Sequence, residues 1–208
     1  AMDSLTTGDS NIAIGASAMG DTNTSTAVDS DYNIIIGHNA GSGDWQSKCV
    51  NNVAIGSSSM NGAMDDADNN TAIGHLTLNA LTTGDTNVAI GNDAGGDITS
   101  GTSNTLMGSE AGHELTTATS NVAIGKSALD RMDGAVTQNV AIGTAAMHGN
   151  LSNVAITGCV AIGHEALEGT LTTGANYSVA IGKEALKGLT SGAGNVAIGY
   201  EALKTLTT

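Results

Sequence analysis

Three histidines stand at one repeated position of this chain, and as a set they are the residues best placed to bind a ligand. His38, His75 and His164 each follow the glycine of a recurring five-residue phrase. If the phrases stack, these side chains share a column, where a threefold axis would gather imidazoles into a metal or anion site. The same position otherwise holds residues typical of a solvated edge: Ala16, Asn92, Lys126, Thr144, Lys183 and Tyr200. We therefore predict surface histidines, no metal and no cofactor, and we find no evident partner for His113 or His148.

Two acidic clusters, Asp65-Asp66-Asp68 and Asp29-Asp31, offer the carboxylates that calcium prefers as ligands. Neither cluster has the spacing of an EF-hand or of the calcium-binding nonapeptide, so we expect solvated turns. No nucleophile, base and orienting residue share a recognisable spacing, and no glycine-rich phosphate loop precedes a predicted helix. The chain is therefore not predicted to be an enzyme.

The single tryptophan, Trp45, lies between Asp44 and Gln46. An exposed indole beside such residues is typical of sugar recognition, because the ring stacks on the apolar face of a pyranose. A lone tryptophan in a loop also caps the neighbouring coil, and we favour that interpretation. Trp45, Asp44 and Gln46 remain the candidate ligand contacts of this chain.

The elements that position these residues come from an internal repeat. The phrase occurs eleven times, from Asn11–Gly15 to Asn195–Gly199. Its glycines, 17 to 22 residues apart, are Gly15, Gly37, Gly56, Gly74, Gly91, Gly108, Gly125, Gly143, Gly163, Gly182 and Gly199. A period of this length predicts a parallel β-solenoid of about eleven coils, in which each unit buries its apolar side against its neighbours. A further copy, Asn153–Thr157, has threonine in place of the glycine, and the repeat does not place it.

Each phrase reads as a short strand with two apolar faces. Val88 and Ile90 point one way and Ala89 the other, because side chains alternate along a strand. An outer strand of a monomeric solenoid should have one polar face. We therefore expect valine and isoleucine to face the coil interior, and the small alanines to meet another copy of the chain, most simply in a homotrimer.

The remaining positions of the unit also predict structure. The constant glycine indicates a corner that cannot carry a side chain. The asparagine that opens nine of the eleven phrases predicts a ladder of stacked amides along the axis. Segments such as Lys183–Lys187 consist of strong helix formers, so we expect one short helical turn per coil.

Composition limits the partners. The 208 residues include 6 basic and 20 acidic side chains, no phenylalanine and no proline. The net charge of −14 disfavours nucleic acid and anionic membranes, and no apolar stretch approaches a membrane span. Cys49 and Cys159 lie about six coils, or roughly 30 Å, apart, whereas a disulfide needs Cα atoms within about 7 Å. We predict two free thiols.

The repeat covers residues 1–208 as one array domain, with irregular coils over 9–69 and regular coils over 70–208. Insertions at 20–32, 41–51 and 60–69 make the first part irregular and argue against the flat threonine array of an ice-binding solenoid. Both ends of the chain fall within a repeat, so we expect a fragment of a longer fibre.

The Asn-Val-Ala-Ile-Gly phrase with a following alanine resembles the head repeats of YadA-like trimeric adhesins and the repeats of phage tail fibres. The resemblance covers nearly the whole chain and implies left-handed parallel β-rolls packed as trimers, although the coils here are longer than those of adhesin heads. Residues Ile162–Ala166 also fit the hexapeptide of left-handed β-helix acyltransferases. That family needs the hexapeptide three times per coil, whereas here it occurs once.

These observations predict a structural or adhesive segment of a trimeric extracellular fibre, on a bacterial surface or virion. Such a segment would display a binding surface or tip for attachment to a host or prey cell, and a receptor or glycan would be its partner. The alternative is a carbohydrate-binding module whose site lies in the irregular N-terminal loops.

Overall fold

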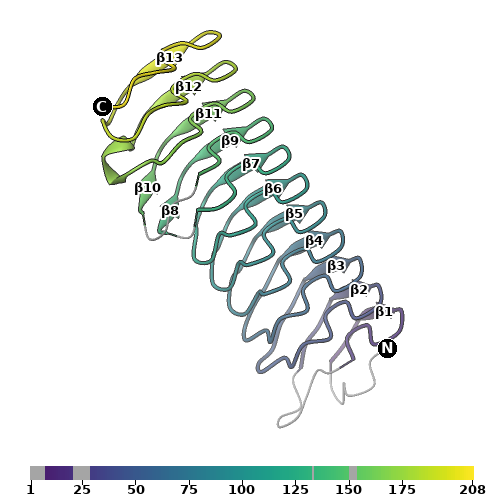
Figure 1. Ribbon diagram of the computed structural model, residues 1–208. Coiled ribbons are helices and arrows are strands. Elements are labelled where there is room, and N and C mark those ends of the chain that lie inside the picture. Colours follow the sequence, from purple (N-terminus) through teal and green to yellow (C-terminus); the bar gives the residue numbers. More distant parts are fainter. Residues whose placement is uncertain (1–7, 21–28, 133, 150–153) are drawn as a thin grey trace.

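The computed structural model describes residues 8–20, 29–132, 134–149 and 154–208 as a rod built on one long parallel sheet, with the two termini at opposite ends (Figure 1). Eleven strands stack along the rod in register, so that Ala89 pairs with Ala72 on one side and Leu106 on the other. The strands are β1 (Ile12–Ile14), β2 (Ile34–Ile36), β3 (Val53–Ile55), β4 (Thr71–Ile73), β5 (Val88–Ile90), β6 (Thr105–Met107), β7 (Val122–Ile124), β9 (Val140–Ile142), β11 (Val160–Ile162), β12 (Val179–Ile181) and β13 (Val196–Ile198). The predicted parallel β-solenoid is confirmed.

The phrase copy at Asn153–Thr157 does not enter this sheet. Its last residues form β10 (Ile156–Thr157), which pairs in parallel with β8 (Val136–Thr137) on another side of the rod (Figure 1). Hydroxyl groups of Thr137 and Thr157 lie 3.0 Å apart along this pair. Asn153 itself lies outside the described residues.

The strand faces are the reverse of the prediction. The alanines are fully buried, whereas valine and isoleucine point outward and are half-buried or exposed. The buried set is Ala54, Ala72, Ala89, Ala123, Ala141, Ala161 and Ala180. Large side chains reach the core from the opposite wall of the coil instead, at the fourth residue after the phrase glycine: Met60, Leu78, Leu129, Met147, Leu167 and Leu186.

Steric complementarity explains this choice. Where the strand carries a large buried residue, Leu106, the neighbouring turns carry glycine, and a Cβ on Gly95 or Gly112 would approach Leu106 Cδ atoms to 2.8–2.9 Å. Ile35, another large buried strand residue, likewise packs against a glycine in the turn, Gly41. The coil is therefore wide enough for one large and one small residue across its core, and close packing requires the two to alternate.

The predicted helical turns are absent from the described residues, where the one helical segment is the short 3-10 helix η1 (Thr173–Ala175). In the turn after Gly182, Glu184 and Leu186 have φ values of 59° and 51°, in the left-handed region. Their amides donate to other coils, Glu184 N to His164 O at 2.9 Å and Leu186 N to Ala202 O at 3.0 Å. Hydrogen bonding between coils therefore overrides the helix propensity of this segment.

The glycine corner and the asparagine ladder are confirmed. The phrase glycines have φ values between 129° and 145°. Asn104 shows the ladder: its Oδ1 accepts from Asn121 N at 3.1 Å, and its Nδ2 donates to Ala118 O at 2.8 Å. The fully or almost fully buried members are Asn33, Asn52, Asn70, Asn87, Asn104, Asn121 and Asn139. The ladder satisfies polar groups that the narrow core would otherwise bury without partners.

Cys159 ends this ladder. Its amide donates to Asn139 Oδ1 at 2.9 Å, and its thiol donates to Ala175 O at 3.3 Å. Cys49 and Cys159 are both free and fully buried, as predicted.

Burial raises the pKa of the Cys49 thiol to about 12, and it also raises the pKa of the Cys159 thiol. We expect neither thiol to react with Ellman's reagent at pH 8 in the native protein, because the thiolate is the reactive form and both sulfurs are inaccessible. In denaturant, two equivalents should react per chain. Rapid reaction of the native protein would contradict the described packing around these residues.

Candidate functional site

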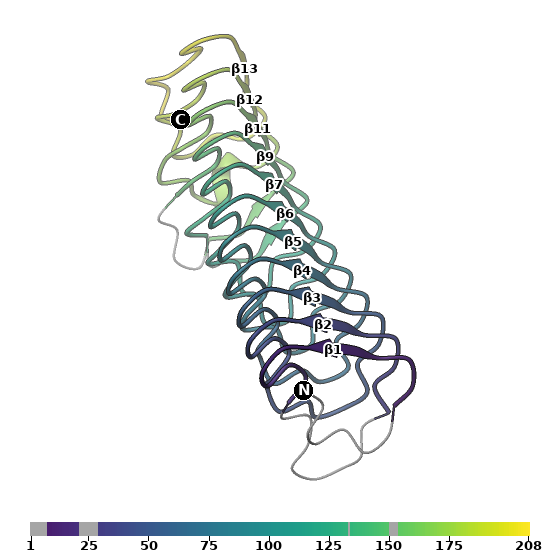
Figure 2. The ribbon, with the colours of Figure 1, turned by 90° about the vertical axis from the view of Figure 1, so that its right-hand side faces the viewer.

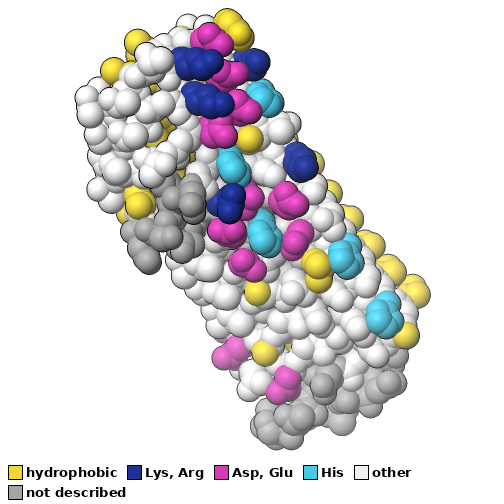
Figure 3. Space-filling model, viewed as in Figure 1, with side chains coloured by type: hydrophobic (Ala, Val, Ile, Leu, Met, Phe, Trp, Pro, Cys, Tyr) yellow, Lys and Arg dark blue, Asp and Glu magenta, His cyan; other side chains and the backbone are white. Residues whose placement is uncertain are grey.

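A column of ionisable side chains runs along one face of the rod, where acidic, basic and histidine residues gather (Figure 3). Its members all stand five residues after a phrase glycine, in six successive coils: His113, Asp130, His148, Glu168, Lys187 and Lys204. Because the strands stack in register, residues at an equal distance from the phrase glycine lie above one another. The column is therefore a direct product of the repeat.

The first half of the column alternates imidazole and carboxylate. His113 Nδ1 lies 3.8 Å from Asp130 Oδ1, and His148 Nε2 lies 4.0 Å from Asp130 Oδ2. The other ring nitrogen of His113, Nε2, lies 3.6 Å from Asp93 Oδ2. His113 is thus placed between two carboxylates, and Asp130 between two imidazoles.

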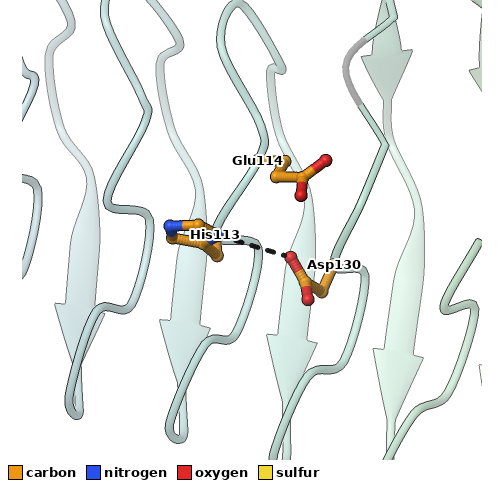
Figure 4. A group of neighbouring side chains, drawn as sticks. All are labelled: His113, Glu114 and Asp130. Atoms are coloured by element: carbon orange, nitrogen blue, oxygen red, sulfur yellow. Dashed lines mark ion pairs between the residues drawn. The ribbon is translucent and has the colours of Figure 1, made fainter. Parts of the chain in front are cut away.

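Asp130 is the most enclosed carboxylate of this group, with only 7% of its surface exposed. Burial raises its pKa, and the hydrogen bond that Oδ1 accepts from Arg131 N at 2.8 Å opposes that shift. Glu114, the residue that follows His113, also belongs to this group. Its Oε1 lies 3.9 Å from Arg131 Nε. Figure 4 shows His113, Glu114 and Asp130 as close neighbours.

The second half of the column is internally paired. Lys187 Nζ lies 2.9 Å from Glu168 and 2.5 Å from Glu165. Lys204 contacts both Glu184 and Glu201. The hydrogen bond from Lys204 lowers the pKa of Glu184 to about 2. These pairs lie near the surface and form an ion-pair ladder in which each acid already has a basic partner.

Trp45 is 1% exposed and belongs to the hydrophobic core. A Cβ on Gly41 would lie 3.2 Å from the indole, so this glycine makes room for the ring. Gln46 Nε2 donates to Asp44 Oδ2 at 2.9 Å, outside the core. The exposed indole on which the sugar-binding hypothesis depends is therefore not present, and the ring packs inside the coil.

The three histidines that follow a phrase glycine are exposed, as predicted. His75 Nδ1 lies 3.1 Å from Asn92 Nδ2, and His164 Nε2 lies 3.5 Å from its neighbour Glu165. No two of these histidines occupy adjacent coils. The structure does not bring them together within the chain.

Some carboxylates of the two acidic clusters have a structural role. Asp68 Oδ1 accepts from Val50 N at 2.7 Å, and Asp68 N donates to Asp85 Oδ1 at the same distance. Asp31 accepts from Asp9 N and Lys48 Nζ. These carboxylates therefore join successive coils through hydrogen bonds.

Sequence reasoning missed the His113–Asp130–His148 group, although the signal was available. The fifth residue after the phrase glycine carries this signal, as the first residue after it carries the three exposed histidines. The same count places all three residues in one column.

The outer face of the long sheet is an apolar stripe. We define the Val/Ile stripe as the outward residues of the strands, among them Ile14, Ile73, Ile124 and Ile198, with 58%, 37%, 37% and 68% of their surface exposed. Figure 2 shows the stacked strands of this face, and hydrophobic side chains line the corresponding edge in Figure 3. The strand residues of this stripe are isoleucine, valine, threonine and methionine, so it carries no charge.

No protein-family model, curated protein or solved structure matches this chain. Among the residues that the structure describes, no helix is long and apolar enough to cross a membrane.

Proposed function

We propose that this chain is a structural segment of a homotrimeric extracellular fibre, in which three copies pack through the Val/Ile stripe. The observation that carries the proposal is that the outward residues of this uncharged, mainly β-branched surface are half-buried or exposed in every strand of the long sheet. Extended apolar surfaces of this kind mark interaction sites. We therefore assign the interface to the Val/Ile face of the strands, and not to the alanine face predicted from the sequence.

The spacing of the stripe favours a second copy of the chain as its partner. Each strand offers a similar outward set, and neighbouring strands lie about 4.8 Å apart. A partner that covers every strand must have a repeat with the same spacing as the strands. A second copy of the chain has this spacing because it has the same sequence. A rotation axis parallel to the rod would bring equivalent strands to one level, and closed symmetry then leaves no stripe uncovered.

The resemblance to YadA-like heads and phage tail fibres favours three copies and a left-handed roll. In such a fibre the stacked coils give a stiff segment, and the acidic surface keeps it soluble. Its task is to display a binding surface or tip for attachment to a host or prey cell. Threefold presentation increases the avidity of weak contacts. This task is mechanical rather than catalytic and requires neither nucleic acid nor membrane contact by the segment.

The oligomeric state tests this proposal. Light scattering over a dilution series should give a mass near three times 20.5 kDa. Ile124→Asp, which places a charge on β7 in the middle of the stripe, should yield monomers, because three carboxylates would be buried together at the axis. Circular dichroism at the same concentration checks that the variant remains folded.

Ser120→Asp is the matched control, because it adds the same charge at an exposed residue outside the stripe. This variant should remain trimeric. A wild-type chain that stays monomeric at all concentrations would overturn the proposal. A trimer that Ile124→Asp leaves intact would place the interface elsewhere.

A further inference from the structure

We infer that His113, Glu114 and Asp130 form a binding site for a divalent transition-metal ion, with Zn²⁺ as the best-fitting representative. Each residue offers one ligand atom, and these three atoms all lie within 4.8 Å of one another (Figure 4). One imidazole with two carboxylates is a donor set that suits zinc and its neighbours in the first transition series. Calcium and magnesium prefer oxygen ligands alone, so the imidazole selects against them.

The backbone holds these donors in place before any metal arrives. His113 and Glu114 are adjacent in the chain, and Asp130 occupies the next coil. Gly112 N donates to Ala128 O at 2.9 Å, which joins the two turns beside the site. His113 O accepts from Asp97 N at 3.0 Å, and Asp130 O accepts from Gly149 N at 3.3 Å. Closing the donors onto an ion therefore requires side-chain rotation and little backbone movement.

The contacts of His113 supply a second and independent indication. Its Nδ1 faces Asp130, while its Nε2 lies 3.6 Å from Asp93 Oδ2. Histidine ligands of metals typically direct their second ring nitrogen at a carboxylate, which fixes the tautomer and orients the ring. Asp93 lies on this side of the His113 ring at ion-pair distance, not yet at hydrogen-bond distance, so we assign it the role of a positioning residue for the metal-bound ring.

The charge balance points the same way. Asp93, Glu114 and Asp130 bring three carboxylates together, whereas Arg131 is the one arginine or lysine within ion-pair distance of them among the described residues. Asp130 is enclosed, and both of its imidazole neighbours lie at 3.8 Å or more, beyond hydrogen-bond distance. A divalent cation would supply the positive charge that balances these carboxylates. His148 lies on the far side of Asp130, 4.0 Å from Oδ2, and is not one of the three proposed ligands.

The site lies on the charged face of the rod, away from the Val/Ile stripe, so it does not depend on the proposed trimer. Its effect would be to join two successive coils, because His113 and Glu114 belong to one coil and Asp130 to the next. An ion that binds only the folded chain stabilises it.

The test uses tag-free protein treated with a chelator and then titrated with Zn²⁺ or Co²⁺ by calorimetry. We expect one ion per chain, a higher Tm in the presence of Zn²⁺, and visible Co²⁺ absorption typical of nitrogen and oxygen ligands at low coordination number. His113→Ala and Asp130→Asn should each weaken Zn²⁺ binding at least 100-fold. His75→Ala, which removes an exposed histidine two coils away, should leave binding unchanged.

Asp93→Asn tests the positioning role. The affinity for Zn²⁺ should fall about tenfold, within the range for outer-shell partners, while the Tm of the metal-free protein stays the same. Absence of Zn²⁺ binding would overturn the inference, as would unchanged binding in His113→Ala. Equal affinity for Ca²⁺ and Zn²⁺ would also overturn it, since the site would then be an acidic surface without selectivity.

Discussion

Gly91→Ala should lower the free energy of unfolding by at least about 3 kcal/mol. Gly91 has a φ of 140°, which residues with a Cβ rarely adopt, and an added Cβ would lie 2.4 Å from the carbonyl oxygen of Gly108. That oxygen belongs to the backbone of the next coil and cannot move aside without disturbing the sheet. Urea denaturation followed by circular dichroism measures the loss.

Gly199→Ala separates the cost of a side chain at a positive φ from the cost of the close approach between coils. Gly199 has nearly the same φ, 131°, but the nearest atom to an added Cβ is Ala202 Cβ at 3.9 Å. This variant carries the conformational cost alone, so its loss of stability should be distinctly smaller. Equal losses in the two variants would show that close stacking of the coils contributes nothing at Gly91.

Asn104→Leu should destabilise the chain by about 3–5 kcal/mol, since each buried polar group left without a partner costs about 1–3 kcal/mol. The substitution removes the acceptor of Asn121 N and Asn121 Nδ2, and the donor to Ala118 O. Leucine is close to asparagine in shape but has no polar atom that could replace these bonds in a fully buried position. Thermal and urea unfolding give the size of the effect.

Two further variants make this test specific. Asn195→Leu removes a bond from Nδ2 to Gly192 O within its own turn, so it should cost much less. Asn104→Asp keeps the acceptor but loses the Nδ2 donors. Because burial should raise the folded-state pKa of this new carboxyl above its unfolded value, the variant should lose stability as pH rises through that range. A variant with no change of stability between pH 4 and pH 7 would contradict the described ladder.

The Asn-Val-Ala-Ile-Gly phrase predicts most features of the fold. Its period predicts the solenoid, its glycine predicts the corner, and its asparagine predicts the ladder. All three follow from local rules, because a strand alternates its faces, a glycine alone tolerates the corner, and equivalent residues stack once the strands are in register.

The turns after the glycine were not predictable in the same way. Lys183–Lys187 has the composition of a helix, yet Glu184 and Leu186 adopt left-handed conformations. Their amides bond to other coils, and this gain exists only once those coils are in place. Helix propensity amounts to a few tenths of a kcal/mol per residue, less than the cost of leaving a buried amide unbonded.

The sequence by itself determined that Val88 and Ile90 face away from Ala89, that the coils stack, and that His113, Asp130 and His148 share a register position. Only the tertiary structure decided which face lies inside, because that depends on Leu78 and its equivalents filling the core from the opposite wall. It also decided that Trp45 is buried and that the imidazoles of His113 and His148 approach Asp130. Alternation along a strand is a local property of the backbone, whereas burial and side-chain contact depend on the volume and charge that other coils supply.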